Sequence, residues 1–108
     1  MTDIIDAEPC ADNAIPDGAL VRNIRIVNRK GLHARATAKF VQCVETFEGA
    51  QVFVSRCGET VGGTSIMGIL TLGAGMGTSI TVSARGEQAE AVLDALEALV
   101  ANRFGEDE

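Results

Sequence analysis

The only histidine of this chain, His33, lies in the segment Gly31-Leu32-His33-Ala34-Arg35. A β-branched stretch precedes the segment and apolar residues at helical spacing follow it, so His33 is expected at the start of a helix. The backbone N–H groups at such a start lack intrahelical acceptors and carry partial positive charge, which suits phosphate. An imidazole beside such a cradle indicates phosphorylation on nitrogen, whereas the alternative is a capping or turn histidine.

Basic residues gather around this histidine although the chain as a whole is acidic. Nine Lys and Arg stand against 15 Asp and Glu, which gives a net charge of −6. The cluster is either ordinary solvated surface or a local positive field that attracts phosphate or an acidic partner. The overall acidity and the absence of Trp and Tyr argue against nucleic acid as a partner. The bases of the cluster are Arg29, Lys30, Arg35 and Lys39.

Length and composition predict one domain with a compact aliphatic core. The chain has 108 residues, 46% of them hydrophobic. No apolar run approaches the roughly 18 residues that span a bilayer, and the acidic N-terminus is unlike a secretory signal. Cys10, Cys43 and Cys57 lack metal-ligand spacing, so no metal is expected. We expect three reduced thiols in a cytoplasmic protein without membrane insertion.

The two ends of the chain differ in composition from its middle. Residues 1–19 are acidic, contain Pro16 and Gly18 and lack an apolar period, so we expect a disordered N-terminal arm. Residues 20–104 are expected to form the domain, and residues 105–108 an acidic tail. The acids of the arm are Asp3, Asp6, Glu8, Asp12 and Asp17.

The hydrophobic pattern of the middle predicts seven elements in the order β-α-β-β-α-β-α. Alternating apolar residues predict strands, and apolar stripes at a spacing of three and four predict helices. This order favours a two-layer α+β sandwich whose outer sheet face is the more polar one, with Thr81, Ser83, Arg22 and Arg25 on it. The expected strands cover 21–27, 52–56, 60–61 and 79–84, and the expected helices 34–48, 66–72 and 87–103.

Over about residues 20–104 the chain resembles HPr, the histidine phosphocarrier family of the phosphoenolpyruvate-dependent phosphotransferase system. Two motifs carry the resemblance: Gly31–Arg35, and Ser65-Ile66-Met67-Gly68 followed by Leu72-Gly73. The resemblance implies an open-faced sandwich in which three helices cover one face of a four-stranded antiparallel sheet. It also implies a bacterial phosphoryl carrier, not an enzyme, that uses no cofactor or metal.

The resemblance also implies roles for the residues of the first motif. His33 would accept a phosphoryl group on Nδ1 from enzyme I and donate it to an enzyme IIA component. The backbone amides of Ala34 and Arg35 would hold the phosphate oxygens, and the Arg35 guanidinium would contact the phosphoryl group or a partner. Ala36 stands where the family usually has proline, which favours a nitrogen-related or regulatory branch over a dedicated sugar-uptake branch.

The second motif supplies a candidate for regulation. Ser65 is expected to be a helix N-cap, and by resemblance it is the serine that a dedicated kinase/phosphorylase modifies. This leaves open an alternative function, a regulatory docking module of the same fold controlled mainly through Ser65. A small-molecule sensor is a third possibility, which the absence of any other convergent polar cluster disfavours.

Partner docking is the remaining expectation. In so short a helix, not all apolar side chains can face inward, and by resemblance some form an exposed patch beside His33. Small, transient interfaces of a monomer are expected, oriented by neighbouring bases. The residues assigned to this surface are Ile66, Met67, Leu70, Lys39 and Lys30.

Overall fold

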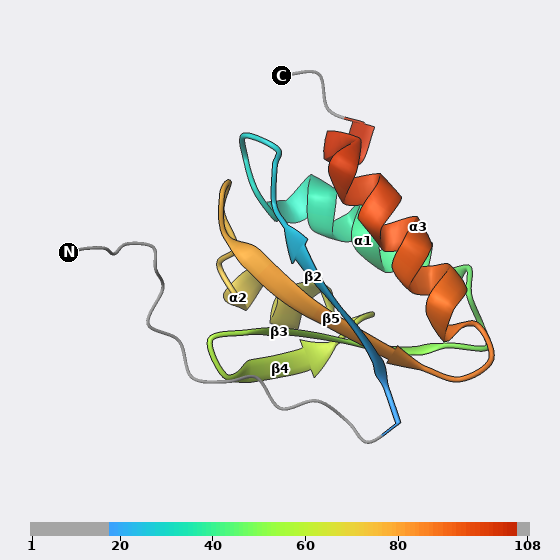
Figure 1. Ribbon diagram of the computed structural model, residues 1–108. Helices are drawn as coiled ribbons and strands as arrows, with labels where there is room; N and C mark the ends of the chain where they lie inside the picture. The colour runs from blue at the N-terminus through green and yellow to red at the C-terminus, as the bar shows by residue number, and fades with distance from the viewer. Residues whose placement is uncertain (1–17, 106–108) are drawn as a thin grey trace.

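The computed structural model describes residues 18–105, which form an open-faced sandwich of two layers (Figure 1). One antiparallel sheet, in the order β2-β5-β3-β4, is made of β2 (Leu20–Arg25), β3 (Gln51–Arg56), β4 (Glu59–Gly62) and β5 (Ser79–Arg85). One face of this sheet is covered by α1 (Ala34–Glu45), α2 (Ile66–Thr71) and α3 (Ala89–Ala101). The predicted fold class and order of elements are therefore confirmed.

The core lies between the sheet and the helices, and strand alternation explains its sheet side. Val52 and Val54 of β3, like Ile80 and Val82 of β5, are buried at every second position. The helices contribute stripes at helical spacing. The buried stripe residues are Ala36, Thr37, Phe40, Val41 and Val44 on α1, and Ala89, Val92, Leu93, Leu96 and Val100 on α3.

Helix α1 ends three residues earlier than the predicted helix 34–48. After Glu45, the amides of Thr46 and Phe47 bond to carbonyls three residues back instead of four. This tighter turn closes the helix before Gly49, the predicted stop. Phe47 nevertheless packs against the core, which is why its spacing extended the apparent stripe.

Strand β2 is also shorter than the predicted strand 21–27. It ends at Arg25, opposite Ser79 of β5. Ile26 still exchanges backbone hydrogen bonds with the turn before β5, through the carbonyl of Thr78 and the amide of Gly77. The chain then leaves the sheet, so Val27 lies in the loop that leads to His33 and not in a strand.

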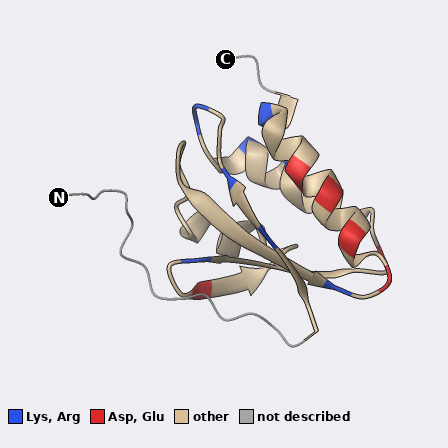
Figure 2. Ribbon diagram, viewed as in Figure 1, with Lys and Arg blue, Asp and Glu red and all other residues tan. Residues whose placement is uncertain are grey.

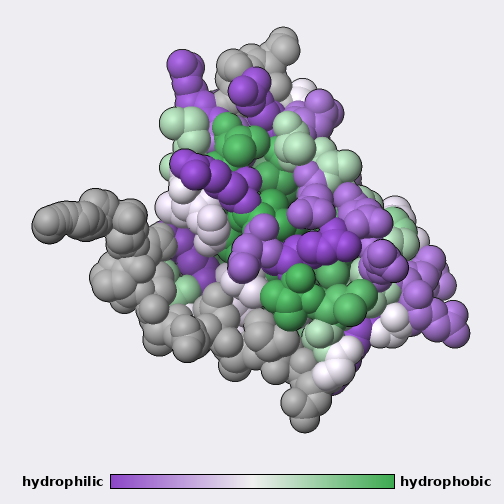
Figure 3. Space-filling model, viewed as in Figure 1, coloured by the Kyte–Doolittle hydropathy of each residue, from purple (hydrophilic) through white to green (hydrophobic). Residues whose placement is uncertain are grey.

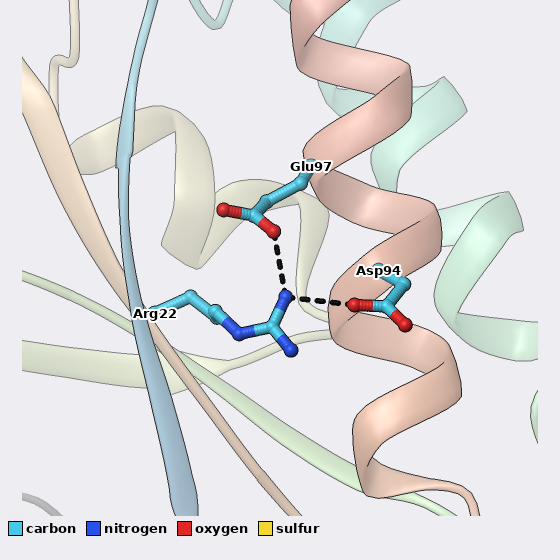
Figure 4. Close-up of polar contacts among 3 residues, drawn as sticks. All are labelled: Arg22, Asp94 and Glu97. Carbon is cyan, nitrogen blue, oxygen red and sulfur yellow. Dashed lines mark hydrogen bonds and ion pairs between the residues drawn. The ribbon is translucent and has the colours of Figure 1, made fainter.

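Arg22 faces the helices and not the outer face of the sheet, so the prediction placing it there was wrong. It lies two residues before the buried Ile24, on the same face of the strand, and its Nη1 reaches Asp94 Oδ1 at 2.9 Å and Glu97 Oε1 at 2.6 Å on α3 (Figure 4). The hydrogen bond to Asp94, reinforced by that to Glu97, raises the pKa of Arg22 above its ordinary value. This arginine clasp, Arg22 with Asp94 and Glu97, ties the edge strand to the last helix.

Removing the arginine clasp is expected to lower thermal stability in a salt-dependent way. In Arg22→Met the aliphatic stem remains while two charge-assisted hydrogen bonds are lost, and salt screens such exposed pairs. The difference in melting temperature from the wild type should therefore shrink as NaCl rises. Arg25→Met on the same strand is the matched control, and an equal effect of the two variants would contradict a specific role for Arg22.

The cysteines depart from the expectation of three reduced thiols. Cys57, in the β3–β4 turn, is disulfide-bonded in the structure, so that expectation is wrong for this residue. Cys43 on α1 is a free thiol, and partial burial raises its pKa. Cys10 lies outside the described residues.

The predicted arm and tail fall largely outside the described part of the chain. The arm was predicted for residues 1–19, of which 1–17 lie outside it, and the tail for 105–108, of which 106–108 lie outside it. Within residues 18–105, no helix has the length and apolar character needed to cross a membrane.

Candidate functional site

His33 caps the start of α1, where the sequence pattern predicted it. Its backbone is extended (φ −78°, ψ −178°), and its carbonyl accepts the Thr37 amide at 2.8 Å. Its side chain is partly exposed and makes no capping hydrogen bond. The amides of Ala34 and Arg35 follow in the first turn, where a helix has no acceptor of its own for them. An imidazole and outward amides thus share one exposed helix end.

The loop before His33 is held by hydrogen bonds to a buried side chain and to a neighbouring segment. Asn28 is fully buried, and its Nδ2 donates to the Gly31 carbonyl at 2.8 Å, while the Gly31 amide donates back to the Asn28 carbonyl at 3.1 Å. The Leu32 amide donates to the Ala74 carbonyl at 2.9 Å, which joins this loop to the segment after α2. Sequence reasoning missed Asn28, because a loop asparagine gives no signal of burial.

Gly31 is required where this loop crosses the segment after α2. Its φ is +65°, a conformation that glycine adopts without a steric penalty. A Cβ added there would lie 2.5 Å from the Ala74 carbonyl oxygen and 2.7 Å from Gly75 Cα. The site motif therefore contains glycine for reasons of packing as well as of turn geometry.

The predicted basic cluster divides into two kinds of side chain. Arg29, Lys30 and Arg35 are exposed, and Figure 2 shows bases in the loop between β2 and α1. Lys39 is only partly exposed, and its Nζ donates to the Phe104 carbonyl at 2.6 Å. Lys39 thus fastens the C-terminal turn to α1, and its assignment to partner binding stays a prediction. The acids of α3 lie along that helix, away from this loop (Figure 2).

Ser65 caps α2 as its position in the sequence predicted. Its Oγ accepts the Gly68 amide at 3.1 Å, and the residue is exposed. A Cβ added at Gly68 would lie 2.8 Å from that Oγ, so glycine leaves room for the cap. The hydroxyl therefore combines a structural hydrogen bond with access from solvent.

Removing this cap is expected to destabilise the fold modestly. Ser65→Ala removes the acceptor of the Gly68 amide, and the loss of an N-cap costs about 1 kcal/mol of unfolding free energy. Ser65→Asp keeps an acceptor and should stay near the wild type. Urea denaturation measures both, with Thr64→Ala as the neighbouring control. A wild-type value for Ser65→Ala would show that the cap contributes nothing.

The exposed apolar side chains beside Ser65 follow the expected pattern in part. Ile66 is 42% and Met67 71% exposed, whereas Leu70 is partly buried and Ile69 is fully buried. Met76, in the loop after α2, is 61% exposed and was missed by sequence reasoning. The loop after α2 also contains Ala74, whose carbonyl accepts the Leu32 amide. A backbone hydrogen bond therefore joins this loop to the loop before His33. We call Ile66, Met67 and Met76 the apolar patch.

No metal-binding group is formed by the described residues. Among residues 18–105, no three His, Cys, Asp or Glu side chains lie close enough together to hold an ion.

Comparison with known proteins gives consistent results. Residues 20–102 match the family described as the PTS HPr component phosphorylation site. A phosphocarrier protein HPr of Cupriavidus necator is 47% identical over 89 residues, which cover 82% of this chain and 99% of that protein. A phosphocarrier protein NPr of Shewanella violacea is 38% identical and covers 81% of this chain and 94% of that protein. A crystal structure of HPr from Thermoanaerobacter tengcongensis superposes with a TM-score of 0.78 at 38% identity, covering 82% of this chain and 99% of that one.

An open-faced sandwich of this topology, with these relatives, defines a phosphocarrier protein and not an enzyme. The chain belongs to the HPr family of the phosphotransferase system. The resemblance in the two sequence motifs is thereby confirmed for the family.

Proposed function

We propose that His33 carries the phosphoryl group, which it accepts from phospho-enzyme I and donates to an enzyme IIA component. The observation that supports this most directly is the position of His33 as the N-cap of α1, where its side chain is partly exposed. The protein acts as acceptor and donor in a relay in the cytoplasm. The protein that receives the phosphoryl group belongs either to sugar uptake or to a nitrogen-related branch. Ala36, which stands where the family usually has proline, favours the nitrogen-related branch.

The transfer step needs only groups that this helix start supplies. Nδ1 of the His33 imidazole attacks phosphorus, an N–P bond forms, and the bond to the donor breaks. The transfer involves no oxidation or reduction. In the second half of the cycle the N–P bond breaks and the phosphoryl group passes to the acceptor. The amides of Ala34 and Arg35 face the oxygens of the incoming group, and the helix dipole favours its negative charge. Arg35, which is exposed in the same turn, adds a charge-assisted hydrogen bond.

Docking is assigned to the apolar patch and the bases around it. An enzyme that delivers or receives phosphate must bury the region around His33 briefly, and exposed methionines adapt to different partners. Lys30 and Arg29 lie in the exposed loop before His33 and orient an acidic partner. Leu70, also assigned to this surface, is partly buried.

Ser65 is proposed as a regulatory phosphorylation site for a dedicated kinase/phosphorylase. Its hydroxyl is exposed and already faces the amides of α2, where a phosphate is well tolerated. The added charge lies next to Ile66 and Met67, so it would repel acidic partners from the apolar patch. Regulation would therefore act on docking and not on folding.

Two chemically distinct phosphates make the proposal testable. Incubation with phosphoenolpyruvate and enzyme I should add one phosphate that acid removes and base does not, as expected for a phosphoramidate. ATP with an extract containing the kinase should add a phosphate that survives acid and is absent from Ser65→Ala. Mass spectrometry follows both.

Each branch can fail separately. An enzyme I preparation that charges a known HPr but leaves this chain unmodified would refute the carrier function. An active kinase extract that leaves Ser65 unmodified would refute the regulatory site alone.

A further inference from the structure

Two of the four buried polar side chains within residues 18–105 bond to the backbone next to His33. These four are Asn28, Thr37, Ser55 and Ser83, each 0% exposed. The two serines lie in strands of the sheet, whereas Asn28 and Thr37 lie on either side of His33 in the sequence. Burying a polar group is unfavourable unless a hydrogen bond compensates for the lost water, so the partners of Asn28 and Thr37 indicate what their burial achieves.

Thr37, in the first turn of α1, bonds to the two peptide groups on either side of the His33 Cα. Its Oγ1 donates to the Leu32 carbonyl at 3.2 Å, and its amide donates to the His33 carbonyl at 2.8 Å. Because peptide groups are planar, the orientations of these two groups set the φ and ψ of His33, which are −78° and −178°. Thr37 therefore helps to fix the direction in which the imidazole leaves the backbone.

Asn28 supports the same backbone from the other side of the loop. The His33 amide donates to the Gly31 carbonyl at 2.9 Å, and that carbonyl also accepts Asn28 Nδ2 at 2.8 Å. The peptide group between Leu32 and His33 is thus bonded both through its oxygen, to Thr37, and through its nitrogen, to the carbonyl that Asn28 holds. Two buried side chains restrain one peptide group from both ends.

The side of this loop that faces solvent is hydrophilic. Arg29 and Lys30 are exposed, and strongly hydrophilic side chains project at this end of the molecule on the face seen in Figure 3. Ala36, in the first turn of α1, has no ring to fix its φ as a proline would. The restraint on His33 therefore comes from the buried side of the loop.

Phosphoryl transfer depends on such a restraint, because the attacking nitrogen must lie in line with the bond that breaks. A misplacement of about 1 Å at a reacting group can slow a reaction by about 100-fold. A side chain keeps its position only when the groups that support it are themselves held by packing and hydrogen bonds. Asn28 and Thr37 supply these bonds to the backbone that carries the imidazole.

We propose that Asn28 and Thr37 are positioning residues for phosphoryl transfer. They hold the backbone of His33 so that Nδ1 faces the place that the phosphorus occupies beside the amides of Ala34 and Arg35. Both side chains are fully buried, so they act through His33 and do not contact the phosphoryl group. This inference rests on the proposed carrier role of His33.

Thr37→Val tests the contribution of the hydroxyl. Valine has nearly the shape of threonine but cannot donate to the Leu32 carbonyl, while the backbone bond to His33 remains. The kcat for phosphorylation by phospho-enzyme I should fall by roughly 10- to 100-fold. KM should stay close to the wild-type value, because the exposed docking residues are unchanged. Thr37→Ser restores a hydroxyl and should recover most of the lost kcat.

Asn28→Leu tests the other side of the loop. The substitution keeps a similar volume but removes the donor to the Gly31 carbonyl, so it should also lower kcat with little change in KM. Ser55→Ala is the matched control. Ser55 is equally buried, and its Oγ lies 2.7 Å from Thr60 Oγ1 in the sheet. Losing that hydrogen bond should lower the melting temperature and leave kcat unchanged.

Hydrogen exchange of the Leu32 amide gives a measurement that needs no partner enzyme. This amide donates to the Ala74 carbonyl, and it should exchange faster when the loop is less restrained. We expect faster exchange in Thr37→Val and Asn28→Leu, and the wild-type rate in Ser55→Ala. Equal exchange in all of these variants would contradict the restraint.

Failure of this inference differs from failure of the carrier role. An enzyme I preparation that charges a known HPr but does not phosphorylate the wild-type chain at His33 would overturn both. A phosphorylated wild type together with equal kcat values for Thr37→Val and Thr37→Ser would overturn the inference alone. A raised KM at unchanged kcat would assign these residues to docking, and losses of kcat that only follow the melting temperature, also in Ser55→Ala, would leave them a purely structural role. Either result would contradict positioning.

Discussion

Replacing His33 by alanine is expected to abolish the acid-labile phosphate that phosphoenolpyruvate and enzyme I produce. The imidazole is the only one in the chain, so no other histidine can accept the phosphoryl group in its place. Folding should be almost unaffected, because the His33 side chain is partly exposed. We expect the unfolding free energy to stay within about 0.5 kcal/mol of the wild type, as for most surface changes.

Phosphate incorporation and urea denaturation, measured on one preparation of His33→Ala, separate chemistry from stability. Ser65→Ala is the control for phosphorylation, since it should lose some stability while still accepting phosphate from enzyme I. Retained acid-labile phosphate in His33→Ala would show that another group carries it, and the carrier assignment of His33 would be wrong.

Replacing Gly31 by alanine is expected to damage both folding and phosphoryl transfer. The new Cβ would lie 2.5 Å from the Ala74 carbonyl oxygen, so the loop or the segment after α2 must move. The left-handed backbone and the overpacking together cost about 2–4 kcal/mol of unfolding free energy. A shift of His33 by 1 Å relative to the helix amides would slow transfer by about 100-fold.

Gly73 provides a matched control for this substitution. It has nearly the same backbone conformation, with a φ of +67°, but a Cβ there meets nothing within 4 Å. Gly73→Ala should therefore lose only the backbone contribution, about 1–2 kcal/mol, and keep normal transfer. Urea denaturation and the initial rate of phosphorylation by enzyme I compare the two. Equal losses in both variants would mean that the close approach of Gly31 to Ala74 has no consequence.

The amino-acid sequence predicted the elements that depend on local pattern. Alternation in residues 79–84 and the stripe through Phe40 and Val44 depend only on nearby residues, and both elements formed, although the helix ends three residues earlier than predicted. The position of His33 at a helix start followed from the change of period after Val27. These are the features on which the site depends most.

Features that depend on distant parts of the chain were not predictable. Arg22 faces α3 because Asp94 and Glu97 lie there, more than 70 residues later. The pattern of residues within one strand does not indicate such a distant partner. The burial of Asn28 depends on the loop as a whole, and the early end of α1 depends on Phe47 reaching the core from outside the helix. Sequence periodicity describes one element at a time, whereas these contacts join two.

The arginine clasp also affects how two copies of the protein can behave toward each other. Strand β2 is at the edge of the sheet and pairs only with β5 among the described strands. An edge strand is the kind of element that two molecules can exchange, each completing the sheet of the other. Here such an exchange must first break the bonds from Arg22 to α3 of its own chain, so the clasp adds a barrier against intertwined dimers.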